Sequence, residues 1–540
     1  MSKFWRDSMT FTSFSKYASS QSLENRMDAP LIRDLVLILM MGTEKFLLMI
    51  QSVLLATVEL LRIILKITYP IANFVFDSLY RVFNGATKPL PAIDNKILLM
   101  PATELAEKIR KRQLKCKDVM RAYVKRSQLV NPYINAVTDS RYVNALQDAI
   151  AVDRFLESGE KTEDQIAEET PLLGVPFTCK ETLGIKGLLQ TTGLVTAKNH
   201  VAEEDGDAGA LYRKAGAIPF AVTNVQETCM WWDSSNHVFG RTKNPYDNSR
   251  TPGGSTSIVS NWGTFPHCQM TPVKKDNRPV EIFISTGPMC RYDKDLPLLM
   301  KVLSENDSRI KLDEKVDFRK VNVYYMKEMQ GTFNGSRPDV RKAIIKAAKH
   351  FEQEFSLKAT PLCIEELKYS FQIWFAKFKE VGSPPLQTNL SYGKSPINIW
   401  WVIFKSLFQL SDHTFPLLFF SAVIKSRKGK NYYFALEKYR SLVKKFEDIF
   451  QEDAIFLFPT HPEPPPHFYT TIPKSRNTGH TCIFNILGFP STAVPAGHSE
   501  GLPISIQVIS GPFKDHLTIA AAQELDKIFG GWKSPCPIHV

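Results

Sequence analysis

The sequence predicts an α/β protein, and two stretches of chain carry that prediction. In the first, apolar segments at 171–180 and 217–224 have the length and composition of buried strands, and a helical pattern at 209–215 lies between them. In the second, a strand pattern at 321–326 precedes a helical pattern at 338–355, which begins with proline, a residue favoured in the first helical turn. Strands alternating with helices at this spacing form parallel sheets, so we expect a parallel β-sheet covered by helices.

The C-terminal part of the chain continues this pattern. Residues Ala454–Pro459 are apolar throughout and predict another buried strand. A last helix is expected over Leu517–Phe529, and Gly530 is placed to end it because glycine readily adopts the left-handed conformation found after helices.

Helices also dominate the region before the first strand. A helix is expected to begin near Pro101, with Thr103 as its N-cap. Asn131-Pro132 is expected to end the following helical segment, because proline disfavours helix continuation. A third helix is expected over about Tyr142–Leu156. These helices are interpreted as one covering layer of the α/β core.

Composition narrows the class of protein. The chain has 540 residues, 44% of them hydrophobic and 23% charged, which is ordinary for a packed globular protein. The net charge of +12 comes without an arginine-rich block, so a nucleic-acid partner is not expected, whereas an anionic membrane surface would suit it. The eight cysteines form no C-x-x-C pair, which argues against zinc sites and disulfides and for reduced thiols facing the cytosol. No metal and no cofactor are expected.

The chain divides into segments of distinct composition. Residues 1–30 form a polar tail, residues 31–76 are strongly apolar, residues 77–100 read as a linker, and residues 101–535 form the main domain. The stretch 46–68 approaches the roughly 20 apolar residues needed to cross a bilayer but contains three charges. It therefore predicts membrane attachment, either as a spanning helix or as a helix lying in the interface, and flanking charges are too balanced to orient it.

Residues 365–425 are unusually rich in aromatic side chains. One interpretation places these rings in an ordinary hydrophobic core. The other makes this insertion an apolar channel or a membrane-facing portal for a lipid substrate, because exposed aromatic surface needs a partner. The insertion contains the rings Phe371, Trp374, Phe375, Trp400, Trp401, Phe404, Phe408, Phe415, Phe419 and Phe420.

Two features indicate a reactive site. Lys180 ends a buried strand, where a lysine is costly unless it is paired or held neutral, although an ordinary lysine could also extend to solvent. Further along, the run 231–257 is polar and contains the Gly253-Gly-Ser255 turn, a composition typical of active-site loops.

The ordered set of motifs from about Pro101 to Trp532 resembles the amidase signature family, and within it the membrane-bound fatty-acid amide hydrolases. Each motif alone is weak, but the whole series in order is specific. The matching stretches are Leu173-Gly-Val-Pro-Phe-Thr-Cys-Lys-Glu, Gly240-Arg-Thr-Lys-Asn-Pro-Tyr-Asp, Thr251-Pro-Gly-Gly-Ser, Ser285-Thr-Gly-Pro-Met-Cys-Arg, Asn485-Ile-Leu-Gly-Phe-Pro, Gly501-Leu-Pro-Ile-Ser-Ile-Gln-Val and Gly511-Pro-Phe-Lys-Asp-His. The resemblance implies a mixed central sheet with helices on both faces, after an N-terminal hydrophobic membrane helix.

The resemblance also implies a Ser–cis-Ser–Lys triad. Lys180 matches the family's base, and Ser255 matches the bridging serine, whose peptide bond is cis in the family. A lysine held neutral in an apolar pocket can accept a proton that the bridging serine relays from a nucleophilic serine. The reverse relay protonates the departing amine, a step that amide hydrolysis requires.

The chain departs from the family pattern directly after Ser255. In the family, a second glycine-rich turn, Asp-x-Gly-Gly-Ser-x-Arg, follows a few dozen residues later and supplies the nucleophilic serine. Here residues 256–286, 31 positions in all, separate Ser255 from Gly287 and contain no Gly-Gly-Ser. The nucleophile and the backbone N–H groups of its oxyanion hole are therefore expected to be absent, together with part of the core.

Three hypotheses remain open. The chain is a membrane-associated serine amidase for fatty-acid amides, a non-catalytic relative that binds a lipid or a partner, or an incomplete, exon-skipped product of an active amidase gene. The third is favoured by the abrupt junction, because the resemblance stops after Ser255 and resumes near 262–265. Expected partners are a lipid amide and a membrane, with a homodimer as an assembly to test. The expected location is an intracellular membrane with the amidase domain in the cytosol.

Overall fold

The computed structural model describes residues 88–253, 286–329, 335–380, 390–391, 397–408, 410–424, 428–472 and 474–540. The expected polar tail 1–30, the apolar segment 31–76 with its membrane helix, and Ser255 all lie outside these residues. Among the helices that are described, none combines the length and the apolar character needed to cross a membrane. The described residues all belong to one compact unit, Phe76–Val540.

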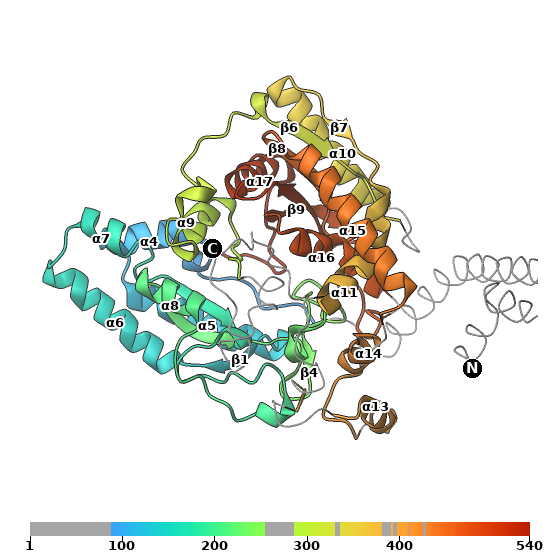
Figure 1. Cartoon of the computed structure of the whole chain (residues 1–540). Helices are drawn as coiled ribbons and strands as arrows, with labels where there is room; N and C mark the ends of the chain where they lie inside the picture. The colour runs from blue at the N-terminus through green and yellow to red at the C-terminus, as the bar shows by residue number, and fades with distance from the viewer. Residues whose placement is uncertain are drawn as a thin grey trace, which may run out of the picture. The chain divides into compact units, whose positions relative to one another are not determined.

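The Lys180 strand belongs to a three-stranded sheet in the order β1-β3-β2, whose edge strand β1 is labelled in Figure 1. Strands β2 and β3 are parallel, as the sequence predicted, and β1 adds an antiparallel edge. The five buried residues of six in β3 show that this strand is covered on both faces. The sheet and its main covering helices are β1 (Val137–Ser140), β2 (Pro176–Lys180), β3 (Ile218–Thr223), α5 (Cys116–Ile134), α6 (Tyr142–Ser158) and α8 (Asp207–Lys214).

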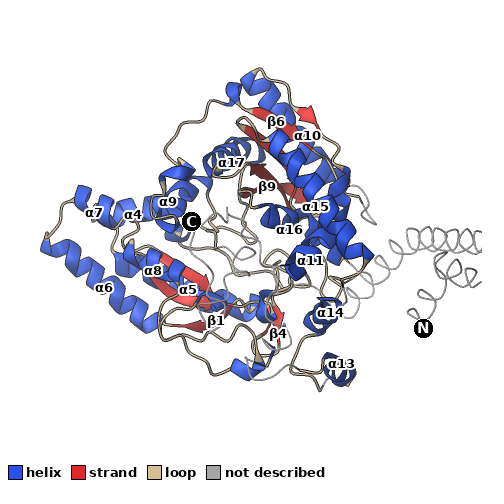
Figure 2. Ribbon diagram, in the orientation of Figure 1, coloured by secondary structure: helices blue, strands red, loops and turns tan. Residues whose placement is uncertain are grey.

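A five-stranded mixed sheet, in the order β7-β6-β8-β10-β9, forms the C-terminal part; its strands β6 and β9 are labelled in Figure 2. Strands β7, β6 and β8 are parallel, whereas β10 is antiparallel to both β8 and β9. Its strands and main covering helices are β6 (Asn322–Tyr325), β7 (Thr360–Pro361), β8 (Ala454–Pro459), β9 (Ser491–Ser499), β10 (Leu502–Ser510), α10 (Pro338–Phe355), α15 (Lys430–Ile449), α16 (Gly479–Leu487) and α17 (Asp515–Phe529).

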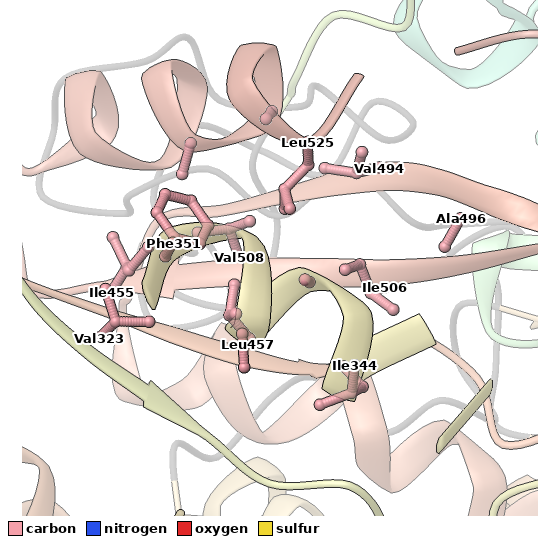
Figure 3. Close-up of a cluster of buried hydrophobic side chains, with 14 of the residues drawn as sticks. Val323, Ile344, Phe351, Ile455, Leu457, Val494, Ala496, Ile506, Val508 and Leu525 are labelled. Atoms are coloured by element: carbon pink, nitrogen blue, oxygen red, sulfur yellow. The ribbon is translucent and has the colours of Figure 1, made fainter. Parts of the chain in front are cut away.

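Strand β8 shows how this sheet is stabilised from both faces. Ile455 and Leu457 pack with Phe351 of α10 in one apolar cluster, together with side chains of α17 (Figure 3). The alternate residues Phe456 and Phe458 lie in a second cluster with the helices of the opposite layer, because successive strand side chains point to opposite faces. Burying each of these side chains contributes about 1.5–3 kcal/mol.

The remaining elements are short or connect these layers. The segment 88–100, the described part of the expected linker, packs beside the C-terminus, where Ile93 N–H donates to the Pro537 carbonyl at 2.8 Å. These elements are α4 (Ala102–Arg110), α7 (Glu163–Glu169), β4 (Ser235–Asn236), β5 (Gly240–Arg241), α9 (Leu296–Leu303), α11 (Ser370–Glu380), α13 (Ile399–Leu407) and α14 (Phe415–Ile424).

Three expectations from the sequence need correction. The strands in the described part of the chain form separate sheets of three, five and two strands rather than one central sheet. Thr103 is not the N-cap of α4; Asp295 instead accepts the N–H groups of Ala102 and Thr103, both at 2.9 Å. Helix α5 continues through Pro132 and ends at Ile134; the next residue, Asn135, has a left-handed backbone and donates its N–H to the Asn131 carbonyl at 2.7 Å.

Candidate active site

Lys180 lies at the carboxyl end of β2, beside Thr223 of the parallel strand β3. Its side chain is half-buried, whereas the preceding Cys179 is buried in the apolar cluster beneath the sheet. Burial raises the pKa of the Cys179 thiol to about 12, so this sulfur stays protonated at neutral pH and is a poor nucleophile. The end of β2 therefore offers a lysine, and not a thiolate, to any reacting group.

Glu181 follows Lys180 directly and its side chain is fully buried. Its carboxylate accepts the backbone N–H groups of Thr191 and of Thr192, the latter at 2.9 Å. Burial raises the pKa of this carboxyl, and the hydrogen bonds from Thr191 and Thr192 oppose that rise. Glu181 thus holds the turn that contains Thr191 and Thr192 against the end of β2, next to Lys180.

The Gly-rich turn is described as far as Gly253, two residues before Ser255. Thr251 N–H donates to the Pro466 carbonyl at 3.0 Å, and Ser234 Oγ donates to the Gly253 carbonyl at 2.9 Å. Gly253 has φ of 90°, a left-handed conformation that a side chain would strain. Ser255 and its expected cis peptide bond lie outside the described residues, so the pairing of Lys180 with Ser255 stays a prediction.

A buried ion pair that the sequence analysis missed stands next to this turn. Asp233 is buried and lies 3.5 Å from Nε of Arg241, whose guanidinium stacks over the rings of Phe468 and Tyr469 at 4.7 and 4.2 Å. Burial raises the pKa of Asp233, and Arg241 opposes the rise. The polar composition of 231–257 was the only signal for Asp233 and Arg241 in the sequence. Their pairing could not be predicted with its aromatic partners, because these come from a segment more than 200 residues away.

The aromatic insertion is partly hydrophobic core and partly exposed surface, and its role as a portal for a lipid stays a prediction. Phe375 and Phe420 are buried in a cluster with Leu417 and Leu418, and Trp374 stacks on Phe378. Other rings are exposed: Trp400 of α13 keeps 67% of its surface accessible. The exposed face of α13, α14 and the residues between them consists of Trp400, Trp401, Phe404, Phe408, Leu410, Phe415 and Phe419.

No metal centre is formed by the described part of the chain, where no group of three or more His, Cys, Asp or Glu side chains is arranged to hold an ion. His480 is fully buried and His461 is half-buried, and burial lowers the pKa of both. Their Nδ1 atoms point to the backbone carbonyls of Glu463 and Asn477 at 2.7 and 3.0 Å. They act as neutral core histidines.

The order of motifs and the fold identify the class of protein. Residues 118–257 and 262–519 match the Amidase family, so the chain belongs to this family of hydrolases of carbon–nitrogen amide bonds. It is 34% identical to Fatty-acid amide hydrolase 2-A of Danio rerio, over 83% of this chain and 92% of that protein. It is also 34% identical to Fatty-acid amide hydrolase 2 of Homo sapiens, over 83% of this chain and 93% of that protein.

Solved structures agree on the fold. A structure of a fatty acid amide hydrolase superposes with a TM-score of 0.61 at 18% identity, over 80% of this chain and 86% of that one. A 6-aminohexanoate cyclic dimer hydrolase superposes with a TM-score of 0.63 at 15% identity, over 81% of this chain and 98% of that one. These likenesses establish the amidase-signature α/β fold.

The family match is interrupted at residues 258–261. This is the stretch at which the sequence analysis places the loss of the nucleophile segment, between Ser255 and residues 262–265. The match on both sides is long, so the interruption affects only a few residues of the chain.

Proposed function

We propose that this chain derives from a membrane-associated amidase that hydrolyses fatty-acid amides to a free fatty acid and an amine. The proposal is supported by the identity to Fatty-acid amide hydrolase 2 of zebrafish and human over most of both chains. Lys180 at the carboxyl end of β2, directly after buried Cys179, is its chemical basis, because such a lysine can act as a base when an apolar environment keeps it neutral.

In the proposed mechanism Lys180 accepts a proton from Ser255, and Ser255 accepts one from the nucleophilic serine as that serine attacks the amide carbonyl. The relay then runs in reverse and protonates the leaving amine. Buried Glu181 keeps the neighbouring turn in place, and Ser234 holds the Gly253 carbonyl that leads into Ser255. No metal or cofactor takes part.

We further propose that the chain as written cannot complete this reaction. The sequence lacks the family's second Gly-Gly-Ser turn after Ser255, and the family match breaks close to this point, at residues 258–261. Loss of a triad serine lowers a rate by up to about 10⁶, and loss of an oxyanion donor by about 10²–10³. Two explanations of the missing segment are an exon-skipped product and a pseudoenzyme. The exon-skipped product is favoured, because mutational drift in a pseudoenzyme would more often replace the nucleophilic serine than remove the whole segment around it.

A restored chain tests both parts of this proposal. Residues 258–261 are replaced by the corresponding segment of the Danio rerio relative, and hydrolysis of a long-chain fatty-acid amide is measured for both chains in detergent micelles. Turnover by the restored chain alone is the expected result. Equal turnover by both chains would contradict the missing nucleophile, and no turnover by the restored, folded chain would contradict the fatty-amide assignment.

Sequencing the transcript across residues 255–265 separates the two explanations of the gap. Recovery of a Gly-Gly-Ser segment in the main transcript supports a skipped or missed exon. A transcript that encodes the chain as written supports the non-catalytic relative that binds a lipid or a partner.

Membrane association is part of the same proposal. The exposed aromatic face of α13 and α14 suits an interfacial position, where aromatic and apolar side chains enter the bilayer, and Lys405 of α13 suits anionic headgroups. The apolar segment 31–76 provides a second attachment in the same chain. We place the amidase domain on the cytosolic side of an intracellular membrane, and a homodimer stays a prediction.

A further inference from the structure

Three non-glycine residues near the end of β2 have left-handed backbones. They are Thr192, Thr228 and Cys229, with φ of 55°, 54° and 56°. This conformation is unfavourable for residues with a side chain, and above all for β-branched threonine. The two turns that contain them are joined, because Thr228 N–H donates to the Thr192 carbonyl at 2.9 Å. Strain of this kind persists only where surrounding contacts enforce it, and it concentrates at functional sites.

Each strained turn is held by its own buried carboxylate. Glu181, next to Lys180, accepts the N–H groups of Thr191 and Thr192. Glu227, only 2% exposed, precedes Thr228 and accepts two hydrogen bonds from the aromatic insertion. These come from Nδ1–H of His413 at 2.6 Å and from Thr414 N–H at 2.7 Å.

Glu227 therefore joins residues 186 positions apart in the sequence. His413 is 7% exposed and Thr414 directly precedes α14, which carries the exposed rings Phe415 and Phe419. A second contact runs in parallel, because Leu194, just after the Thr191–Gly193 turn, packs with Leu417 and Leu418 of α14. The insertion and the Lys180 turn are thus connected through both polar and apolar contacts.

We propose that this Glu227 bridge couples the seating of the aromatic face on an anionic lipid surface to the ordering of the turn beside Lys180. The bridge has the strained turns at one end and the exposed helices α13 and α14 at the other. A shift of α14 therefore moves Glu227 through its bonds to His413 and Thr414, and then Thr228 and Thr192 through the backbone hydrogen bond between them. Glu227 and His413 are positioning residues, since neither is placed at the reacting atoms. This inference rests on the membrane part of the proposed function.

Hydrogen–deuterium exchange on the full chain tests the coupling. Exchange of peptides covering residues 181–193 and 221–232 is compared without and with vesicles of phosphatidylcholine and phosphatidylserine. Vesicles are expected to slow exchange of these peptides by about fivefold, the lower end of coupling between two sites. The Glu227→Gln variant is expected to lose this response because its neutral amide weakens the His413 hydrogen bond.

A matched control is Glu366→Gln. Glu366 is also a nearly buried carboxylate with two side-chain partners, Lys445 Nζ at 2.7 Å and Ser441 Oγ at 3.0 Å, but both partners lie on α15 and not on α13 or α14. This variant is expected to keep the full vesicle response. If Glu227→Gln does not fold, the same measurement on His413→Ala decides the matter.

Co-sedimentation with vesicles, measured in parallel, separates the two levels of the proposal. A chain that does not sediment with vesicles overturns both the membrane proposal and the coupling. A chain that sediments without any change in exchange, or a Glu227→Gln variant that keeps the response, overturns the coupling alone. The triple variant Trp400→Ser, Trp401→Ser, Phe404→Ser is expected to lose the exchange response, while segment 31–76 still retains the chain on vesicles. If this variant keeps the exchange response, the coupling is overturned as well.

Discussion

The strands β8 and β2 differ in their burial and in how they end, although both run parallel to a neighbour. All six residues of β8 are buried and apolar, and their side chains pack into two hydrophobic clusters, one on each face of the sheet. Strand β2 instead ends in half-buried Lys180 and leads into fully buried Glu181 and a strained turn. A buried carboxylate and left-handed threonines both cost free energy. Their occurrence at the end of β2 supports the reactive site proposed there, whereas β8 stabilises the five-stranded sheet.

The largest expected effect sharpens the functional side of this comparison. In the chain with the nucleophile segment restored, Lys180→Met is expected to lower kcat for a fatty-acid amide by about 10⁴–10⁶, because no base remains to accept the relayed proton. The midpoint of urea unfolding is expected to change little. A loss of less than about tenfold, with folding intact, contradicts the role of Lys180 as base.

The next effect tests the stability side. Phe351→Ala removes a fully buried ring that packs edge-on against Phe318 at 5.1 Å, and is expected to cost about 3–5 kcal/mol of unfolding free energy. The control Tyr433→Ala changes a ring that is largely exposed and should cost less than about 0.5 kcal/mol. Urea unfolding of both variants measures the difference. Similar costs for the two would break the comparison, because burial would not then set stability in this sheet.

A third effect concerns Asp515 at the start of α17, where burial raises the carboxyl pKa to about 7. Because the folded pKa lies above the unfolded one, the stabilising contribution is present below about pH 4 and is lost as the pH rises through 7. The Asp515→Asn variant stays neutral, so it should match the wild type at pH 4 and exceed its stability at pH 8 by about 4 kcal/mol. Parallel pH curves of the two unfolding free energies would contradict this.

The smallest effect concerns the start of α4. Asp295→Ala removes the acceptor of two backbone N–H groups and of Thr103 Oγ1, and should cost about 2 kcal/mol. Thr103→Ala removes only its hydroxyl bond and should cost about 1 kcal/mol or less. Urea midpoints compare the two variants. If Thr103→Ala costs more unfolding free energy than Asp295→Ala, Thr103 is the N-cap, as the sequence predicted.

These examples show which features a sequence pattern can specify. The bounds of β8 and α10 are as predicted, and α17 begins two residues earlier than expected, because local apolar periodicity and terminal residues determine such elements. The pairing of strands into separate sheets was not predicted, since local pattern does not encode distant partners. The cap from Asp295 was missed for the same reason, because Asp295 lies more than 190 positions from the helix that it caps.

The candidate site divides in the same way. Lys180 at the carboxyl end of a parallel strand was predicted, and the structure places it there. The Glu227–His413 and Asp233–Arg241 pairs were missed, because each becomes visible only when the chain has folded. The triad role of Lys180 and Ser255 came from the family resemblance and stays a prediction.

Covalent labelling tests the central claim, that this chain has the base of an amidase and lacks its nucleophile. The chain as written and the segment-restored chain are incubated with a fluorophosphonate probe, and adducts are counted by intact-mass spectrometry. The account predicts one adduct on the restored chain and none on the chain as written. A stoichiometric serine adduct on the chain as written would show that another residue serves as nucleophile and would contradict the account.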